Sequence, residues 1–378
     1  MIYLDNGATS FPKPRGMMTA MEECILNYCG NPGRSGHAMS LKTGEAVYHA
    51  RQCVADLFHI SDGSRLVFTK NTTEALNLGM RGILEDGDHV ITTSMEHNSV
   101  LRPLKFLERK GVTQSVIRAD REGLIKTSDI EKCITPKTRM IAVTSASNVT
   151  GTKMPLAEIG RLARRCGLLF LVDGAQGAGN IELDVEKLNI DLLAFPGHKG
   201  LLGPQGTGGL YVAPNLKLKP LLHGGTGTES KSRIQPVEFP EGFEAGTVNA
   251  PAIVGLGYSA AFVSRIGPER IGAYEEGLIR RLEEKLREMP FVTIYGPPPQ
   301  QKTGITLFNI DGCRAEEVTE LLSSQFGIAV RGGFHCAGLA HKTIGTWDMG
   351  AVRASVGPYN STADVDALAD AVWKIGRK

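Results

Sequence analysis

Leu168-Leu-Phe-Leu-Val-Asp173-Gly-Ala-Gln176 joins five apolar residues to a carboxylate and a short turn. An uninterrupted apolar run of this length is typical of a strand that is buried on both faces of a sheet. Asp173 then follows at the carboxyl end of the strand. Because ligands bind at the carboxyl ends of the strands in open α/β sheets, Asp173 indicates where a site is expected.

Similar apolar runs precede and follow this strand in the sequence. Between about residues 40 and 250, short apolar runs alternate with amphipathic segments. The expected strands are Leu66–Thr69, His89–Thr92, Met140–Thr144, Leu168–Val172, Asp191–Phe195 and Gly209–Val212. The expected helices are Thr73–Arg81, Val100–Arg109 and Leu156–Cys166. Such alternation predicts a mainly parallel sheet with helices on both faces.

After about residue 256 the pattern changes. A long helical stretch, Leu256 to Met289, precedes expected strands near Phe291–Tyr295, Ile305–Ile310, Ile328–Arg331 and Val352–Val356, and a terminal helix near Ala363–Ile375. We therefore expect three parts. Residues 1–15 pack near the active site, residues 16–255 form a large α/β domain, and residues 256–378 form a smaller α+β domain.

The composition excludes several classes of protein. The 378 residues include 42 Lys and Arg against 40 Asp and Glu, so no basic excess favours nucleic acid as a partner. No apolar run is long enough to span a membrane, and the first residues lack the features of a signal peptide. Seven cysteines without a disulfide pattern indicate free thiols, and hence a cytoplasmic protein.

A second strand, Asp191-Leu-Leu-Ala-Phe-Pro196, leads into the turn Gly197-His198-Lys199. A lysine is usually a surface residue, and a lone aspartate is usually a loop or cap residue. Together, Lys199 and Asp173 supply what pyridoxal phosphate needs: an amine for a Schiff base and a carboxylate for the pyridine nitrogen.

A phosphate group also needs a binding site. Asn71-Thr72-Thr73-Glu74 follows a strand and begins a helix, so its amides and hydroxyls can bind an anion. Ordinary helix capping by Asn71 or Thr72 is the alternative for this segment taken alone. The glycine motifs of dinucleotide and nucleoside triphosphate sites are absent from the sequence.

With these residues the sequence resembles the class V aminotransferase-like, fold-type I pyridoxal phosphate enzymes. Within them it is similar to the cysteine desulfurases of the group II, selenocysteine lyase-like branch. The resemblance covers nearly the whole chain. Its markers are Tyr3-Leu-Asp-Asn-Gly-Ala-Thr, Asn71-Thr-Thr-Glu-Ala-Leu-Asn, Met95-Glu-His-Asn-Ser-Val, Ser147-Asn-Val-Thr-Gly-Thr, Val172-Asp-Gly-Ala-Gln, Gly197-His-Lys, Phe243-Glu-Ala-Gly-Thr-Val-Asn, Val330-Arg-Gly-Gly-Phe-His-Cys336 and Val352-Arg-Ala-Ser-Val-Gly-Pro.

The resemblance implies the cofactor pyridoxal 5′-phosphate and a role for each matching residue. Lys199 would form the Schiff base, and His97 would stack on the ring and transfer protons. The implied cofactor-binding residues are Lys199, Asp173, Gln176, His97, Thr72, Thr73, Asn148, His198, Gly246 and Thr247. Of these, Gly246 and Thr247 would reach the phosphate of a neighbouring subunit, so an active homodimer is implied.

Arg353 would bind the substrate carboxylate through its planar guanidinium, with Asn148 and His37 beside the substrate. Cys336 occupies the position of the family's nucleophile. The resemblance thus implies a desulfurase that converts L-cysteine to L-alanine, leaves a persulfide on Cys336 and delivers sulfur, for example to an acceptor protein for iron–sulfur clusters.

Three alternatives stay open at this point. One is a selenocysteine lyase or another lyase or aminotransferase of the same family. A second is a cofactor-binding protein with weak or no catalysis, because Pro196 replaces a residue that usually contacts the phosphate and has neither hydroxyl nor N–H to offer. A metal site built from His335, Cys336 and His341 is a third idea, but the regular spacing of a fourth ligand is missing.

Overall fold

A seven-stranded sheet forms the centre of the computed structural model, which describes residues 1–33 and 35–377. Its strand order is β2-β8-β7-β6-β5-β3-β4. The strands are β2 (Leu66–Thr69), β3 (His89–Thr93), β4 (Thr113–Ile117), β5 (Thr138–Thr144), β6 (Leu169–Asp173), β7 (Leu192–Pro196) and β8 (Gly208–Val212). All neighbours pair in parallel except β8, which is antiparallel to both β2 and β7.

The six strands expected in this region are all present. β4 was not expected, and its sequence explains why: Thr113-Gln-Ser-Val-Ile117 lies at the edge of the sheet, with only Ile117 buried. An edge strand of this kind lacks the apolar run that identifies a central strand.

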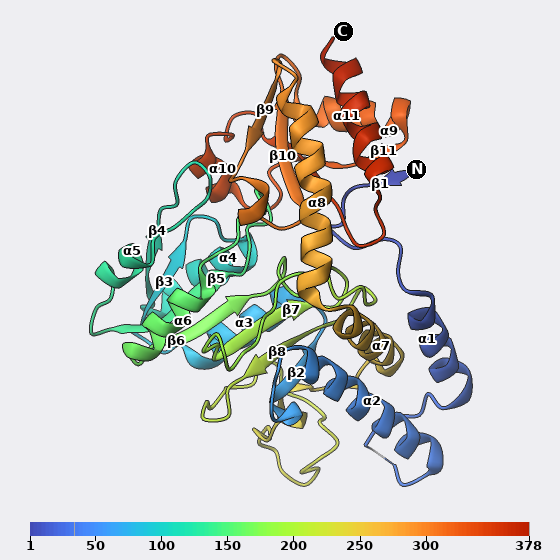
Figure 1. Ribbon diagram of the computed structural model, residues 1–378. Helices are drawn as coiled ribbons and strands as arrows, with labels where there is room; N and C mark the ends of the chain where they lie inside the picture. Colours follow the sequence, from blue (N-terminus) through green and yellow to red (C-terminus); the bar gives the residue numbers. More distant parts are fainter. Residues whose placement is uncertain (34, 378) are drawn as a thin grey trace.

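The central strands are buried on both faces. In β5, Ile141 and Val143 join one hydrophobic cluster, and Met140 and Ala142 join a second cluster on the opposite face. Side chains alternate across a strand, so a strand covered on both faces has a continuous apolar sequence. The covering helices include α2 (Ala38–Leu57), α3 (Thr72–Ile83), α4 (Asn98–Leu107), α5 (Thr127–Lys132) and α6 (Leu156–Arg165). Figure 1 shows this part in blue to green in its lower half.

The expected helical stretch from Leu256 to Met289 is two helices, not one. α7 (Ala250–Ile266) packs against α1 (Arg15–Asn27) and α2, and α8 (Pro268–Arg287) rises toward the C-terminal part (Figure 1). Between them Gly267 has φ +92°, which favours glycine, and Pro268 begins α8. Proline fits the first turn of a helix and interrupts a helix interior, so the Gly267-Pro268 pair separates the two helices.

The C-terminal part contains a four-stranded antiparallel sheet in the order β12-β13-β10-β9. Its strands are β9 (Val292–Tyr295), β10 (Ile305–Ile310), β12 (Arg331–Gly333) and β13 (Ala351–Ser355), and α8, α9 (Ala315–Phe326) and α11 (Thr362–Gly376) pack around them. The strand expected at Ile328–Arg331 is divided: β11 (Ile328–Ala329) pairs elsewhere, and Arg331 begins β12. The domain boundaries at residues 15 and 255 stay a prediction.

The first residues of the chain lie against the C-terminal part. β1 (Ile2–Tyr3) pairs in parallel with β11, and Asp5 forms a bridge with Ser355. The segment then reaches the large sheet, where the Ser10 amide donates to the carbonyl of His198 across 3.0 Å. It therefore connects two parts of the molecule that are distant in sequence.

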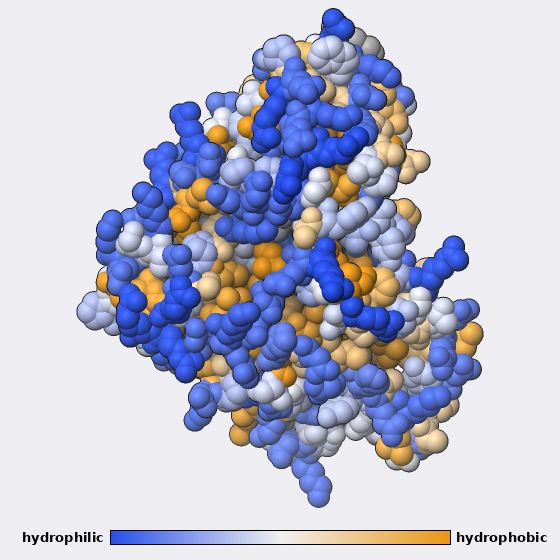
Figure 2. Space-filling view, viewed as in Figure 1, coloured by the Kyte–Doolittle hydropathy of each residue, from blue (hydrophilic) through white to orange (hydrophobic). Residues whose placement is uncertain are grey.

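The surface is mostly polar. Figure 2 shows hydrophilic side chains over the whole visible face, with apolar side chains between them, some at the lower right where Figure 1 places α1 and α2. The exposed apolar residues of these two helices are Met18, Ile25, Leu26, Met39, Leu41 and Tyr48. Among the described residues, no helix has the length and apolar composition needed to cross a membrane.

Candidate active site

Five strands bring chemically active residues to one edge of the large sheet. β2, β3, β5, β6 and β7 run in the same direction, so their carboxyl ends lie together. The residues at or just after these ends are Thr72 and Thr73, His97, Asn148, Asp173 and Lys199, in strand order. These are positions that the sequence singled out, and they define the candidate active site.

Lys199 and Asp173 influence each other's charge at this edge. Burial lowers the pKa of Lys199 to about 8, and the positive charge of Arg353 adds to the effect. Burial also raises the pKa of Asp173, while the charge of Lys199 opposes that shift. The Asp173 carboxylate accepts a hydrogen bond of 2.9 Å from the Ala175 amide. The site therefore holds an amine that becomes neutral near pH 8, next to a buried carboxyl group.

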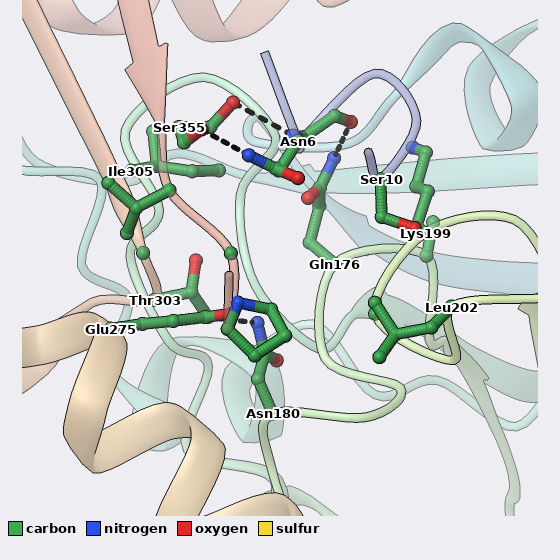
Figure 3. A pocket seen from close by; sticks show the side chains of 17 residues that line it. Asn6, Ser10, Gln176, Asn180, Lys199, Leu202, Glu275, Thr303, Ile305 and Ser355 are labelled. Atoms are coloured by element: carbon green, nitrogen blue, oxygen red, sulfur yellow. Dashed lines mark hydrogen bonds between the residues drawn. The ribbon is translucent and has the colours of Figure 1, made fainter. Parts of the chain in front are cut away.

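A small cavity of about 30 Å³ opens beside Lys199. Figure 3 shows Gln176 between Lys199 and Ser355, all three of which line this cavity. Gln176 donates from Nε2 to the carbonyl of Gly7 across 3.0 Å, and the Gly7 amide donates to Ser355 Oγ across 2.8 Å. The N-terminal segment therefore forms one wall of the site, and Gln176 contacts it directly.

His97 caps α4 and is hydrogen-bonded to a neighbouring serine. The Ser99 amide donates to His97 Nδ1 across 3.0 Å, so a neutral His97 carries its proton on Nε2. The Ser99 hydroxyl lies 2.9 Å from the same nitrogen and 2.8 Å from Thr73 Oγ1. Burial, followed by the charge of Lys199, lowers the pKa of His97 to about 4. The ring therefore stays neutral at physiological pH, with Nε2 as a donor.

His198 contacts the N-terminal segment. Its Nδ1 lies 3.1 Å from Thr9 Oγ1, and burial followed by the charge of Lys199 lowers its pKa to about 4. Lys13 donates from Nζ to the His198 carbonyl across 2.8 Å and to Ser10 Oγ across 2.7 Å. Burial lowers the pKa of Lys13 to about 8. Lys13 is thus a second perturbed lysine near the site, and no motif in the sequence pointed to it.

Cys336 lies on a loop that is tied to the same sheet edge. The loop follows β12, and its His335 and Cys336 both have positive φ, +51° and +57°. The carbonyl of Cys336 accepts from the Asn98 amide across 2.9 Å, and the carbonyl of His335 accepts from Asn148 Nδ2 across 2.6 Å. The thiol is exposed, and its sulfur lies 3.8 Å from Arg331 Nη2. The Arg331 guanidinium is thus within reach to donate to the sulfur.

Arg353 extends from β13 into the site and is buried. It donates from Nη1 to the Asn148 carbonyl across 2.8 Å and from Nη2 to Asp5 Oδ1 across 2.9 Å. Its Nε is buried without a hydrogen-bond partner, as is Asn148 Oδ1. Buried polar atoms are nearly always hydrogen-bonded. Two unsatisfied atoms on neighbouring residues therefore favour a polar ligand at this position.

Three residues named from the sequence do not join this group within one chain. His37 is exposed and caps α2 by accepting from the Ser40 amide across 3.2 Å. Gly246 and Thr247 line a separate cavity of about 360 Å³, together with Lys70 and Glu74. Their expected roles at the active site stay predictions.

Sequence reasoning missed several residues at the site. Asp5, Ser99 and Arg331 all lie inside motifs that carried the family resemblance, but the motifs alone suggested no partner for them. Their roles became visible only through contacts with Arg353, His97 and Cys336. By contrast, all ring nitrogens of His335 and His341 are engaged within the protein, which argues against a metal site shared with Cys336.

The fold and this edge of the sheet define the fold-type I architecture of pyridoxal phosphate-dependent transferases. A sequence model described as aminotransferase class-V matches residues 2–368, and the chain belongs to that family.

Relatives within the family carry a narrower name. A "probable cysteine desulfurase" of Methanothermobacter thermautotrophicus is 37% identical over 380 residues, covering 99% of this chain and 94% of the relative. The apo structure of a cysteine desulfurase from Thermococcus onnurineus superposes with a TM-score of 0.94 at 37% identity, covering 100% of this chain and 94% of that one. A cysteine desulfurase from Escherichia coli superposes with a TM-score of 0.87 at 30% identity, covering 99% and 94%.

Proposed function

We propose that this protein is a pyridoxal 5′-phosphate-dependent cysteine desulfurase that uses Cys336 as its nucleophile. The observation that carries the proposal is the anchoring of the Cys336 loop to residues that follow β3 and β5, at the edge that also holds Lys199. A thiol, an amine and a buried arginine thus occur at one site. The names of the relatives support the same activity.

The residues present fit the proposed cofactor. Lys199 offers an amine whose lowered pKa makes it available to an aldehyde near neutral pH. The buried carboxyl of Asp173 can hold a proton on a pyridine nitrogen. Thr72, Thr73 and the amides of the first turn of α3 can bind a phosphate. When bound, pyridoxal phosphate supplies an aldehyde for amino groups and a ring that withdraws electrons from the carbon beside it.

Other residues would act on the substrate. Arg353 is suited to a carboxylate, because its guanidinium is planar and its Nε lacks a partner. The hydrogen bond from Ser99 to Nδ1 makes His97 a donor through Nε2, so Lys199 is the better candidate for the base that removes a proton from the substrate.

The proposed sulfur transfer balances without any further reactant. The Cys336 sulfur bonds to the substrate sulfur while the carbon–sulfur bond of L-cysteine breaks. The proton of the Cys336 thiol is transferred to the alanine that leaves. The products are L-alanine and a persulfide, whose outer sulfur an acceptor can remove. Exposure of Cys336 supports such a transfer.

A homodimer is part of the proposal. α1 and α2 both carry exposed apolar side chains, among them Leu26 and Tyr48, of the kind that a protein interface buries. Gly246 and Thr247 line a different cavity from Lys199 in one chain, which accords with sites completed by a second subunit. Cytoplasmic location and membership of the group II branch are proposed on the sequence alone.

Turnover of L-cysteine by the cofactor-loaded protein tests the function. Alanine is measured by amino-acid analysis, and the persulfide by mass spectrometry of the Cys336 peptide. Cys336→Ala should lose both products. Cys166→Ala is the matched control, because Cys166 is also an exposed thiol but lies at the end of α6.

Each outcome has a distinct meaning. Alanine release by Cys336→Ala at the parent rate would show that Cys336 is not the nucleophile. Pyruvate and ammonia in place of alanine would identify a β-lyase. Turnover of L-selenocysteine but not of L-cysteine would identify a selenocysteine lyase. A loaded protein that yields no product from either amino acid would refute the desulfurase.

A further inference from the structure

A buried chain of hydrogen bonds lies behind Cys336. His335 and His341 are 2% and 0% exposed, and Thr346 is 1% exposed. His341 Nδ1 lies 2.7 Å from Thr346 Oγ1, His341 Nε2 lies 3.1 Å from His335 Nδ1, and His335 Nε2 lies 3.2 Å from the Arg331 carbonyl. The two rings stack with an interplanar angle of 15°. This chain, which we call the imidazole chain, is not used in the proposed reaction.

The end of the imidazole chain determines where every proton lies. The Arg331 carbonyl can only accept, so His335 Nε2 carries a proton. If His335 is neutral, its Nδ1 accepts, and His341 Nε2 must donate to it. His341 Nδ1 then accepts from the Thr346 hydroxyl. All four ring nitrogens are satisfied by this one arrangement, in which both rings are uncharged.

The surroundings keep both rings uncharged. Burial lowers the pKa of His335 to about 2, and the positive charges of Arg353 and Arg331 act in the same direction, while the hydrogen bond to the Arg331 carbonyl opposes them. Burial alone lowers the pKa of His341 to about 4. Phe334 packs edge-on against His341 with centroids 5.4 Å apart, and Trp347 packs against Phe334. The imidazole chain therefore acts as a neutral connection between α10 (Gly338–Ile344) and β12.

The imidazole chain connects directly to the nucleophile. His335 precedes Cys336, and both residues hold a left-handed backbone that costs energy for residues other than glycine. The chain also binds the carbonyl of Arg331, whose guanidinium contacts the Cys336 sulfur. Through His335 and the Arg331 carbonyl, the imidazole chain therefore fixes the two residues whose separation sets the environment of the thiol.

We propose that His341 is a positioning residue for the nucleophile: through its hydrogen bond to His335, it holds the Cys336 thiol beside Arg331. The proposal rests on the function proposed above only in naming Cys336 as the nucleophile. Among the described residues, the side chain of His341 bonds to His335 and Thr346, and not to the Cys336 sulfur or to a residue expected to bind the substrate. It acts through His335 and the loop backbone.

The test measures how fast iodoacetamide alkylates Cys336 in the cofactor-loaded protein at pH 7, by mass spectrometry of its peptide. His341→Leu keeps the volume but removes the hydrogen bonds, and alkylation should slow by at least about fivefold, because a thiol without its neighbouring cation is less reactive. His341→Gln keeps an N–H donor for His335 and should react within about twofold of the parent protein. Alkylation of Cys166 in the same samples is the internal control.

The outcomes separate positioning from mere stability. Parent-like alkylation of Cys336 in His341→Leu would overturn the proposal, and so would equal slowing in His341→Leu and His341→Gln. If His341→Leu does not fold, Thr346→Val and Thr346→Ser replace it: slowing in the valine variant alone supports the proposal, and no slowing in either overturns it. These rates require no turnover, so a failed desulfurase assay would leave the result interpretable.

Discussion

The guanidinium of Arg353 donates to the carboxylate of Asp5 across 2.9 Å, joining the start of the chain to a strand near its end. Arg353 is 1% exposed, whereas the Asp5 side chain keeps 21% exposure. A buried arginine needs a compensating charge. Asp5 therefore holds Arg353 in place and fixes the N-terminal segment as a wall of the site.

Removal of the Asp5 carboxylate should destabilise the protein. Asp5→Ala leaves a buried guanidinium with only the Asn148 carbonyl as a partner, so we expect a loss of about 2–3 kcal/mol in the free energy of unfolding. Asp5→Asn keeps an oxygen acceptor and should lose about half as much. Urea unfolding measures both. Glu85→Gln is the control, because it removes an exposed ion pair with Lys219 and should change nothing. Equal stability of Asp5→Ala and the parent would contradict this account.

Cofactor loading should depend on pH through Lys199. The lowered pKa of about 8 means that the amine is protonated and unreactive below this pH, and neutral above it. The rate at which pyridoxal phosphate reloads the cofactor-free protein should thus rise with pH and level off above about 8. The visible absorbance of the loaded protein reports the rate. Lys199→Ala should never develop this absorbance, and a loading rate that is flat from pH 6 to 9 would be inconsistent with a perturbed amine.

Replacement of His97 should lower the rate of catalysis without lowering the stability of the protein. Asparagine is a good helix cap, so His97→Asn can keep the bond from the Ser99 amide and the stability of α4. The Nε2–H donor of the imidazole is lost, and kcat for L-cysteine should fall about 10²-fold or more. Steady-state kinetics and thermal unfolding measure the two effects. A variant with parent-like kcat would remove His97 from the reaction.

Acid should destabilise the protein partly through His341. Its folded pKa of about 4 lies below the ordinary value of 6.5, so the folded state resists a proton that the unfolded state accepts. The stability that this neutral ring contributes is complete above about pH 6.5 and is lost as the pH falls toward 4. Each such group changes the free energy of unfolding by up to about 1.4 kcal/mol per pH unit. His341→Gln should therefore show a shallower pH dependence than the parent in urea unfolding between pH 6.5 and 4. Parallel curves would mean that His341 is not buried as a neutral ring.

Glu275 should have the opposite pH dependence. This carboxyl is buried, accepts from Asn180 Nδ2 across 3.1 Å, and has a pKa that burial raises to about 8. The folded state keeps a proton that the unfolded state releases above about pH 4.5, so stability falls as the pH rises toward 8. Glutamine resembles the protonated acid. Glu275→Gln should thus raise the free energy of unfolding at pH 7, by up to about 3 kcal/mol.

The control for this prediction is Glu284→Gln, which changes an exposed glutamate of the same helix. We expect Glu284→Gln to leave the free energy of unfolding unchanged at pH 7 and at pH 8. If Glu275→Gln destabilises the protein at pH 7 and pH 8 alike, the carboxyl is ionised in the fold and its assigned environment is wrong.

Much of the large sheet could be predicted, because a strand that is buried on both faces has an uninterrupted apolar sequence. Leu169 to Val172 are all apolar, and the strand ended within one residue of its expected boundary. The same reasoning failed for β4, an edge strand with exposed polar residues. It also could not give the direction of β8, because the apolar pattern of a buried strand is the same whichever way the strand runs.

In the candidate site too, the sequence indicated some residues and missed others. The residue types and the strand ends, taken as a pair, indicated Lys199 and Asp173, whereas Cys336 was assigned through the family resemblance, and the roles of all three stay predictions. The sequence did not reveal the residues that contact the groups of the site. Asp5 meets Arg353 across 348 residues of sequence, and Arg331 reaches Cys336 only because the loop turns back on itself.

The sequence by itself determined most of the succession of strands and helices and the family, and it predicted the reactive groups, because these depend on local apolar pattern and on side-chain chemistry. Only the tertiary structure decided which nitrogen of His97 carries the proton, which acid compensates Arg353, and which residues His341 contacts behind Cys336. Each of these depends on a hydrogen bond or a loss of water between residues that the fold brings together, and such contacts leave no periodic signal along the chain.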